Sequence, residues 1–216
     1  MKIHYTGYAK FKSKPLRFLY SFPWFAMGSS WALQGLLYMD PTERYFKLGL
    51  DLLATLLIGG LLAPLKLPLL RWGLAFFIAH SFNFLFNGQL WGGLKCFGYV
   101  YNGYERYIAY MNGLAARAKS EPSIHKALAF GSIAREQWTP HSDLDVRLLR
   151  KPGLINGLRA CVFLLSERTR AFLAGFPLDA YVLDSEVPLG RLREQGVLLS
   201  KDEGDQAPST ASKTAL

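Results

Sequence analysis

Cysteine and charge are both scarce in this chain of 216 residues. Its only two cysteines, Cys96 and Cys161, form neither a metal-ligand spacing nor a disulfide framework. This excludes a small disulfide-stapled scaffold and indicates a reducing compartment, with Cys161 as a small core residue of a helix. Charged residues make up only 19% of the chain and apolar residues half of it, a high apolar share for a soluble protein of this length.

Acidic residues are especially scarce near the N-terminus. The chain has 25 Lys and Arg against 16 Asp and Glu, and its net charge is +9. Residues 1–47 hold only two acids, Asp40 and Glu43, beside seven basic residues. A basic excess just ahead of apolar sequence is typical of the cytoplasmic side of a membrane protein, although ordinary solvated lysines are the alternative. No cleavable signal is expected, because Pro15 and Pro23 interrupt the segment that would form its apolar core.

The apolar residues crowd the first hundred positions, so we expect two units of different character. Residues 1–103 would form a hydrophobic, membrane-associated region. Within it, 48–64 and 67–87 approach the ~20 residues that cross a hydrocarbon core as a helix. Residues 18–39 carry no charge, but they are rich in aromatics and interrupted by Pro, Gly and Ser. That composition favours an interfacial segment over a third span.

We interpret the two spans as an α-helical hairpin across the membrane, with Lys66 and Arg71 near its tip. A re-entrant or monotopic hairpin, or a buried pair of core helices, are the alternatives. His80, Asn83 and Asn87 share one face of the second helix. Polar groups at membrane depth need partners, so this face should look inward or toward a second copy of the chain in a homo-oligomer.

After residue 103 the sequence changes to ordinary amphipathic patterns. Residues 104–200 predict an α/β (α+β) domain in which helices flank a short mixed sheet. The expected elements are a helix over 104–119, a strand at 126–130, a helix over 154–174 and a strand at 178–183. The tail, 201–216, is polar and predicted to be disordered.

The helix over 154–174 has an apolar spacing of its own. The predicted buried face consists of Leu154, Leu158, Cys161, Val162 and Leu165. Gly175 is expected to end the helix.

A glycine turn and a pair of acids carry the chemistry. Gly131 follows the strand at 126–130 and lacks a Cβ, so backbone amides can approach a phosphate there, and Ser132 adds a hydroxyl. Further on, Asp143 and Asp145 alternate on a second predicted strand, which sends both carboxylates to one face. Paired carboxylates repel one another unless a cation lies between them, and Mg²⁺ is the natural occupant.

The complete segment at 131–145, GSIAREQWTPHSDLD, resembles the nucleotidyltransferase superfamily that includes DNA polymerase beta. It is most similar to minimal members such as the nucleotidyltransferase antitoxins and the aminoglycoside nucleotidyltransferases, over roughly residues 115–200. The resemblance implies that Gly131 and Ser132 bind the triphosphate of a nucleotide, expected to be ATP. It also implies that Asp143 and Asp145 are catalytic ligands of Mg²⁺.

Members of this family add a third acid on a neighbouring strand. Asp179 fits that description and would complete the catalytic, metal-binding set. Asp184 is its rival, but it lies on the opposite pleat at the end of the same strand.

Three residues of the connecting loop remain open to two interpretations. Arg135 would bind phosphate or pair with a nearby acid. Glu136 stands where minimal members often have glycine, so it could reshape the loop or place an acid near the phosphates. Trp138 could stack on a base or anchor the loop.

The sequence therefore predicts a membrane-anchored, Mg²⁺-dependent nucleotidyltransferase. It would transfer a nucleoside monophosphate from a nucleoside triphosphate to an unidentified hydroxyl or phosphate acceptor. Nucleoside triphosphates are cytoplasmic, and an even number of crossings would place the catalytic domain on that side. A catalytically weak, antitoxin-like interaction module is the alternative. No nucleic-acid partner is expected, because the basic excess lies beside the membrane segments rather than around the motif.

Overall fold

The computed structural model describes residues 13–87, 89–94, 97, 101–191 and 195–201. Cys96 lies outside the described residues, as does the predicted disordered tail beyond Lys201.

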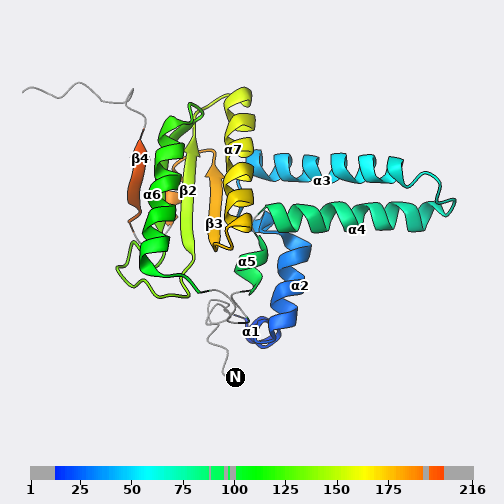
Figure 1. Ribbon diagram of the computed structural model, residues 1–216, viewed down its shortest axis with the longest axis horizontal. Coiled ribbons are helices and arrows are strands. Elements are labelled where there is room, and N and C mark those ends of the chain that lie inside the picture. The colour runs from blue at the N-terminus through cyan, green and yellow to red at the C-terminus, as the bar shows by residue number, and fades with distance from the viewer. Residues whose placement is uncertain (1–12, 88, 95–96, 98–100, 192–194, 202–216) are drawn as a thin grey trace, which may run out of the picture.

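Four strands form one mixed sheet in the order β3-β2-β1-β4 (Figure 1). Strand β1 (Ile124–Phe130) pairs antiparallel with both β2 (Leu144–Arg150) and β4 (Val197–Lys201), whereas β3 (Leu178–Leu183) runs parallel to β2. The predicted mixed sheet is thus confirmed. Sequence reasoning missed β4, an edge strand whose side chains are mostly exposed.

Two helices cover one face of this sheet. Helices α6 (Tyr104–Ser120) and α7 (Leu154–Leu173) share one core with the inward-facing residues of β2, which are Leu144, Val146 and Leu148. Both helices lie close to their predicted positions. The domain is therefore a mixed α+β unit, and the other face of its sheet carries the alternate residues of β2 and β3.

The predicted buried face of α7 is largely wrong. Leu154, Leu158 and Val162 are 80%, 49% and 54% exposed, and of the predicted set only Cys161 is fully buried. The helix packs against the sheet on one side and against α3 and α4 on another. The sector that it buries is centred on small and polar residues: Gly157, Ala160, Cys161, Leu164, Glu167, Arg168 and Ala171. Gly175 follows the helix in the left-handed conformation, as predicted (φ +60°).

The N-terminal region is helical throughout its described part. Its elements are α1 (Lys14–Tyr20), α2 (Pro23–Leu33), the 3-10 helix η2 (Leu36–Tyr38), α3 (Pro41–Leu61), α4 (Pro68–Phe86) and α5 (Gln89–Leu94). Helices α3 and α4 form a hairpin that projects away from the sheet, and α2 runs crosswise at its base (Figure 1). Helix α5 lies in the chain between the hairpin and the α+β unit. A further 3-10 helix, η4 (Leu189–Arg191), follows β3.

Among the described residues, α4 is the one helix long and apolar enough to cross a membrane by length and composition. Helix α3 begins at Pro41, seven residues before the predicted start of its span. Its first turns carry charged residues, among them Glu43 and Lys47, that are buried against the α+β unit and the rest of the hairpin base.

The free edge of β3 is covered by the base of the hairpin. Glu43 accepts a hydrogen bond from the backbone N–H of Val182 (2.8 Å), and Asp40 accepts one from the N–H of Asp184 (2.8 Å). Arg168 of α7 ion-pairs with Glu43 (2.7 Å) and donates to a backbone carbonyl of the same strand. An edge strand exposes unpaired backbone groups, so these contacts close the sheet and join the hairpin to it.

Candidate functional site

The structure brings the three predicted acids together at one end of two parallel strands. Asp145 of β2 and Asp179 of β3 are direct neighbours in the strand register. The sequence predicted Asp143 within this strand, but the residue lies one position ahead of β2. In the described part of the chain, no three His, Cys, Asp or Glu side chains are already gathered at metal-binding distances, so the carboxylates would have to turn toward a shared ion.

The environment of this cluster shifts the pKa of Asp145. Burial, repulsion from Asp143 and Asp179, and a hydrogen bond with Asp179 together raise the pKa of Asp145 to about 8. Arg147 opposes this shift but does not cancel it. At neutral pH the cluster therefore holds a proton that an isolated aspartate would have lost.

Gly131 packs directly against the buried acid. Its φ is +72°, in the left-handed region, and a Cβ at this position would overlap Asp145 Oδ2. Glycine is thus required here both by the backbone conformation and by the close approach. The turn that follows is closed by hydrogen bonds from the N–H of Arg135 to Gly131 O (3.2 Å) and from the N–H of Gln137 to Ser132 O (2.8 Å).

The hydroxyl of Ser132 is buried beside this turn. Ser132 Oγ makes no hydrogen bond within the part of the chain that the structure describes. The Tyr107 hydroxyl lies close to Ser132 and donates to the carbonyl of Asp143 (3.2 Å). Trp138 packs against the rings of Tyr104 and Tyr107, with centroids 5.1 and 6.2 Å away, so it anchors the loop to α6.

Arg147 is a site residue that sequence reasoning missed. Its Nη1 donates to Asp179 O (3.0 Å), and its Nη2 lies 3.5 Å from Asp179 Oδ2. Its guanidinium also lies over the ring of Tyr181, 4.7 Å from the centroid. The available signal was its position two residues after Asp145, which places it on the same face of β2.

Arg135 and Glu136 both lie on the exposed part of the loop. Glu136 has a φ of +55°, a left-handed conformation in which a residue with a Cβ is strained.

Asp184 lies at the opposite end of β3 from the acid cluster. It accepts hydrogen bonds from Arg150 Nε (2.7 Å) and from the backbone N–H of Thr42 (3.1 Å) in the first turn of α3. Partial burial works to raise the pKa of Asp184, but these hydrogen bonds outweigh it and hold the pKa below its ordinary value. Its contacts are those of a residue that fastens α3 to the sheet.

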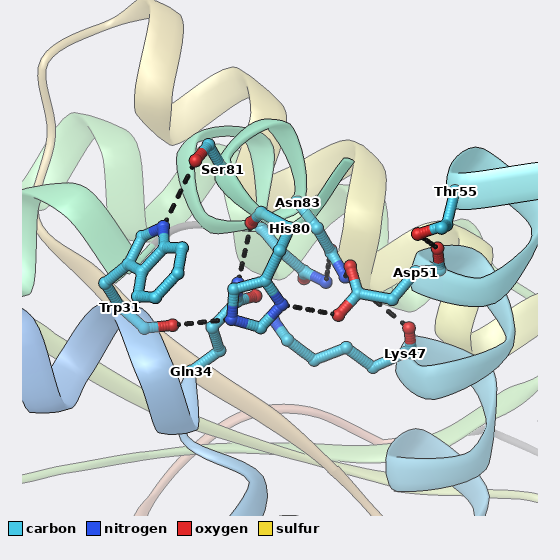
Figure 2. A network of polar contacts seen from close by, with 9 residues as sticks. Trp31, Gln34, Lys47, Asp51, Thr55, His80, Ser81 and Asn83 are labelled. Atoms are coloured by element: carbon cyan, nitrogen blue, oxygen red, sulfur yellow. Dashed lines mark hydrogen bonds and ion pairs between the residues drawn. The ribbon is translucent and has the colours of Figure 1, made fainter. Parts of the chain in front are cut away.

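A second polar cluster occupies the base of the hairpin (Figure 2). His80 lies between Asp51 and the end of α2: its Nδ1 is 2.8 Å from Asp51 Oδ2, and its Nε2 is 2.9 Å from the carbonyl of Trp31. Asn83 donates to Asp51 Oδ1 (2.7 Å) and accepts from Asn87 (2.8 Å). The predicted polar face of α4 thus looks inward, with partners inside this chain.

That cluster continues to the α+β unit. Arg168 donates to Asn87 Oδ1 (2.7 Å) as well as to Glu43. The chain of contacts therefore runs from His80 to the edge of β3, the strand that carries Asp179.

No protein-family model matches this chain, and no curated protein matches it either.

Proposed function

We propose that this protein is a membrane-anchored nucleotidyltransferase that transfers a nucleoside monophosphate, with ATP the expected donor, to a hydroxyl or phosphate acceptor. One observation carries the proposal. Asp145 and Asp179 stand side by side on parallel strands, Asp143 lies next to them, and a left-handed glycine turn packs against Asp145. This is the arrangement that the resemblance of residues 131–145 to the nucleotidyltransferase superfamily implies.

The donor set suits magnesium. All three side chains offer carboxylate oxygens, the ligands that Mg²⁺ prefers. Burial and, after it, the repulsion among these carboxylates raise the pKa of Asp145 to about 8, and a cation would relieve the repulsion. Asp143, Asp145 and Asp179 would hold the ion, and when bound it would neutralise charge on the phosphates.

The loop beside the acids suits a triphosphate. Gly131 lets the backbone of the turn lie directly against Asp145, because it has no Cβ to overlap that carboxylate. Ser132 Oγ is a buried hydroxyl without a hydrogen-bond partner among the described residues, and a phosphate oxygen would supply one. Arg135, on the exposed part of the loop, would approach the same phosphates.

The proposed reaction is an in-line displacement at the α-phosphorus. The acceptor oxygen forms a bond to that phosphorus while the bond between the α-phosphorus and its bridging oxygen to the β-phosphorus breaks, and pyrophosphate leaves with the electron pair. The acceptor's proton passes to the carboxylate of Asp179, whose side chain is 37% exposed and thus reachable. Arg147 would position Asp179 through its hydrogen bond to the backbone and its ion pair.

The hairpin supports attachment to a membrane. Its outer surface exposes large apolar residues along both helices, an arrangement that water disfavours. Nucleoside triphosphates are cytoplasmic, so we place the catalytic domain on the cytoplasmic side. An acceptor within or at the membrane is then within reach, although attachment alone does not identify it.

Glu136 favours one other function. Its strained backbone, at a position where minimal family members often have glycine, would suit a catalytically weak, antitoxin-like interaction module. Such a module would bind nucleotide without transferring it.

An activity assay separates these functions. The purified full chain would be incubated with Mg²⁺, a membrane extract as acceptor pool and each labelled triphosphate in turn. Label transfer and pyrophosphate release are expected, and the double variant Asp143→Ala with Asp145→Ala should lose both. Glu186→Ala, which removes an exposed acid paired with Lys126, is the matched control and should transfer normally.

Two results would contradict the enzyme proposal. The double variant could label as well as the unaltered protein, which would place the chemistry elsewhere. Nucleotide binding without transfer, by the unaltered chain with every triphosphate, would favour the interaction module.

A further inference from the structure

The hairpin formed by α3 and α4 has a long apolar outer surface. Large side chains are exposed along both helices, among them Leu52, Leu57 and Phe77, and the two most exposed, Leu61 and Leu69, lie at the tip. The two helices cannot bury these side chains against each other, so the side chains need a further apolar environment. A hydrocarbon phase fits, because the exposed band continues around both helices rather than forming a single seam.

Helix α2 indicates how deep the hairpin can sit. Trp31 at its C-terminal half contacts α4: its Nε1 donates to Ser81 Oγ (3.2 Å), and its carbonyl meets His80 Nε2 (2.9 Å). Gln34, just after α2, donates to the carbonyl of His80 (2.7 Å). The C-terminal end of α2 therefore meets the hairpin at the level of His80, as Figure 2 shows.

The character of α2 suits the boundary between lipid and water. It runs crosswise to the hairpin and exposes Phe22, Trp24 and Phe25 at its N-terminal end. Helix α1, directly before it, carries the exposed residues Lys14 and Arg17. Aromatic and basic residues of this kind anchor helices that lie in the interface plane. In the middle of a bilayer these two helices would place the two basic side chains of α1 and their own unpaired helix ends in hydrocarbon, which is costly.

Beyond this level, the length of the hairpin is about half the thickness of the hydrocarbon core of a bilayer. The ten residues that follow Asp51, the partner of His80, bring α3 to its end and extend about 15 Å. The twelve residues of α4 ahead of His80 extend about 18 Å. The hydrocarbon core is about 30 Å thick, so a hairpin whose base lies at the interface ends near the bilayer midplane.

The tip is folded on itself. Arg71 Nε donates to the carbonyl of Gly59 (2.7 Å), and its guanidinium lies over the ring of Trp72, which packs against Gly59. One tip cation is thus satisfied inside the hairpin rather than directed toward water. Lys66 is the charge at the tip that would be the one exposed basic side chain held in hydrocarbon at this depth, so its surroundings differ most between a hairpin that crosses and one that does not.

We propose that the hairpin is monotopic: it penetrates one leaflet, with α2 lying in the interface, and does not cross the membrane. This rests on the membrane attachment in the proposed function and replaces the crossing hairpin that the sequence predicted. Because the chain makes no crossing, the catalytic domain and both ends of the hairpin stay on the same side. The acid cluster is then held beside the lipid headgroups of one leaflet.

The test uses the full chain in sealed lipid vesicles. A background without native thiols is made by Cys96→Ser and Cys161→Ala. Ala63→Cys then places one thiol at the tip, and Ser166→Cys places one on the exposed polar side of α7 as a reference. A water-soluble, membrane-impermeant maleimide is supplied on both sides of the membrane.

Each outcome is decisive. If the hairpin is monotopic, the thiol at 63 is not labelled until detergent is added, whereas the thiol at 166 is labelled at once. A fluorophore at 63 should then be quenched more by spin labels near the acyl-chain ends than by labels near the headgroups. Labelling at 63 in intact vesicles from which carbonate cannot extract the protein would show a crossing hairpin and overturn the proposal. Extraction by carbonate, with both thiols labelled equally, would instead contradict the membrane attachment. The proposed nucleotidyl transfer would still be tested separately by its activity assay.

Discussion

Glu43 in the first turn of α3 accepts a hydrogen bond from the backbone N–H of Val182, 139 positions later in the chain and three residues beyond Asp179 in β3. The same carboxylate ion-pairs with Arg168 of α7, and both side chains are only 2% exposed. The base of the hairpin is therefore built into the edge of the sheet. This connection joins the hairpin directly to the strand that carries Asp179.

Loss of the Glu43 charge should destabilise the whole protein. Glu43→Gln keeps the shape and an oxygen for the Val182 N–H but leaves the buried guanidinium of Arg168 without its counter-charge. Removing one partner of a buried ion pair costs about 3–5 kcal/mol. Thermal unfolding of the protein in detergent would measure the loss.

The matched control is Glu186→Gln, because Glu186 pairs with Lys126 at the surface, where it is 62% exposed. An exposed pair contributes about 1 kcal/mol or less, so this variant should unfold almost normally. Equal, small losses for both variants would show that the hairpin does not depend on this contact.

Asp179 and Asp184 should separate activity from stability. Asp179→Ala removes the acid next to Asp145 and should reduce transfer by about 100-fold or more, with little loss of stability. Asp184→Ala removes the acceptor for Thr42 and Arg150, so it should cost about 1–2 kcal/mol and leave transfer nearly intact. Initial rates and melting temperatures of the two variants provide the comparison.

The pH dependence of stability gives a second check on Asp184. Its pKa is lowered in the folded state, so the stability that it contributes is present near neutral pH and is lost as the carboxyl becomes protonated. The difference between Asp184→Ala and the unaltered chain should therefore shrink in acid. A loss of transfer in Asp184→Ala as large as in Asp179→Ala would undo the distinction between them.

These two aspartates also show how far the sequence could be interpreted. Alternation along β3 separates Asp179 from Asp184, and the glycines at 131 and 175 mark the turns that end β1 and α7. Such features are local, and local backbone rules predict them. The register that sets Asp179 beside Asp145 is a pairing of distant strands, which alternation alone does not specify.

The missed features share one physical cause. The Glu43 contact joins helices and strands far apart in the chain, and a charged residue in sequence does not reveal which partner will bury it. Periodicity misidentified the buried side of α7 because Arg168 and the small residues there pack against the hairpin, while Leu154 and Leu158 stay exposed. Long-range packing decided both cases.

Replacement of Gly131 should affect the site as well as stability. In Gly131→Ala the new Cβ would overlap Asp145 Oδ2 and occupy a left-handed backbone, so we expect a loss of transfer together with about 1–2 kcal/mol of stability. Gly175→Ala is the control, because its φ is also positive but the nearest atom to its Cβ, in Trp91, is 3.6 Å away. That variant should lose stability and keep its activity. Equal activity in both would separate the glycine turn from the chemistry.

Glu136→Gly should stabilise the loop. The residue is exposed and has a φ of +55°, so glycine removes backbone strain of about 1 kcal/mol without removing a buried contact. Gln137→Gly is the neighbouring control: its backbone has no positive φ, and glycine there should cost about 0.5–1 kcal/mol through the unfolded chain. Unchanged transfer in Glu136→Gly, with a higher melting temperature, would show that Glu136 only strains the loop. A large rise in transfer would show that the glutamate itself restrains catalysis.

The raised pKa of Asp145 predicts a conflict between stability and function. In the unfolded chain the carboxyl ionises near its ordinary value of 3.8, whereas in the folded protein it does so at about 8. Between these values the folded state holds a proton that the unfolded state has released, so rising pH lowers stability, and the penalty is complete above pH 8. Asp145→Asn keeps the shape without the charge, so it should unfold at a higher temperature than the unaltered chain. At pH 8 the gain should be about 1–2 kcal/mol, and at pH 5 it should be smaller.

Magnesium should stabilise the unaltered chain and leave the stability of Asp145→Asn almost unchanged. A cation bound by the acid cluster relieves the same repulsion, so Mg²⁺ should raise the melting temperature of the unaltered chain, and more strongly at pH 8 than at pH 6 because fewer protons compete for the site. Asp145→Asn should show little response to the ion and no transfer. Melting curves at the two pH values, with and without Mg²⁺, test the point. An Asn variant that is less stable than the unaltered protein at pH 8 would mean that the three carboxylates do not repel one another enough to require a cation.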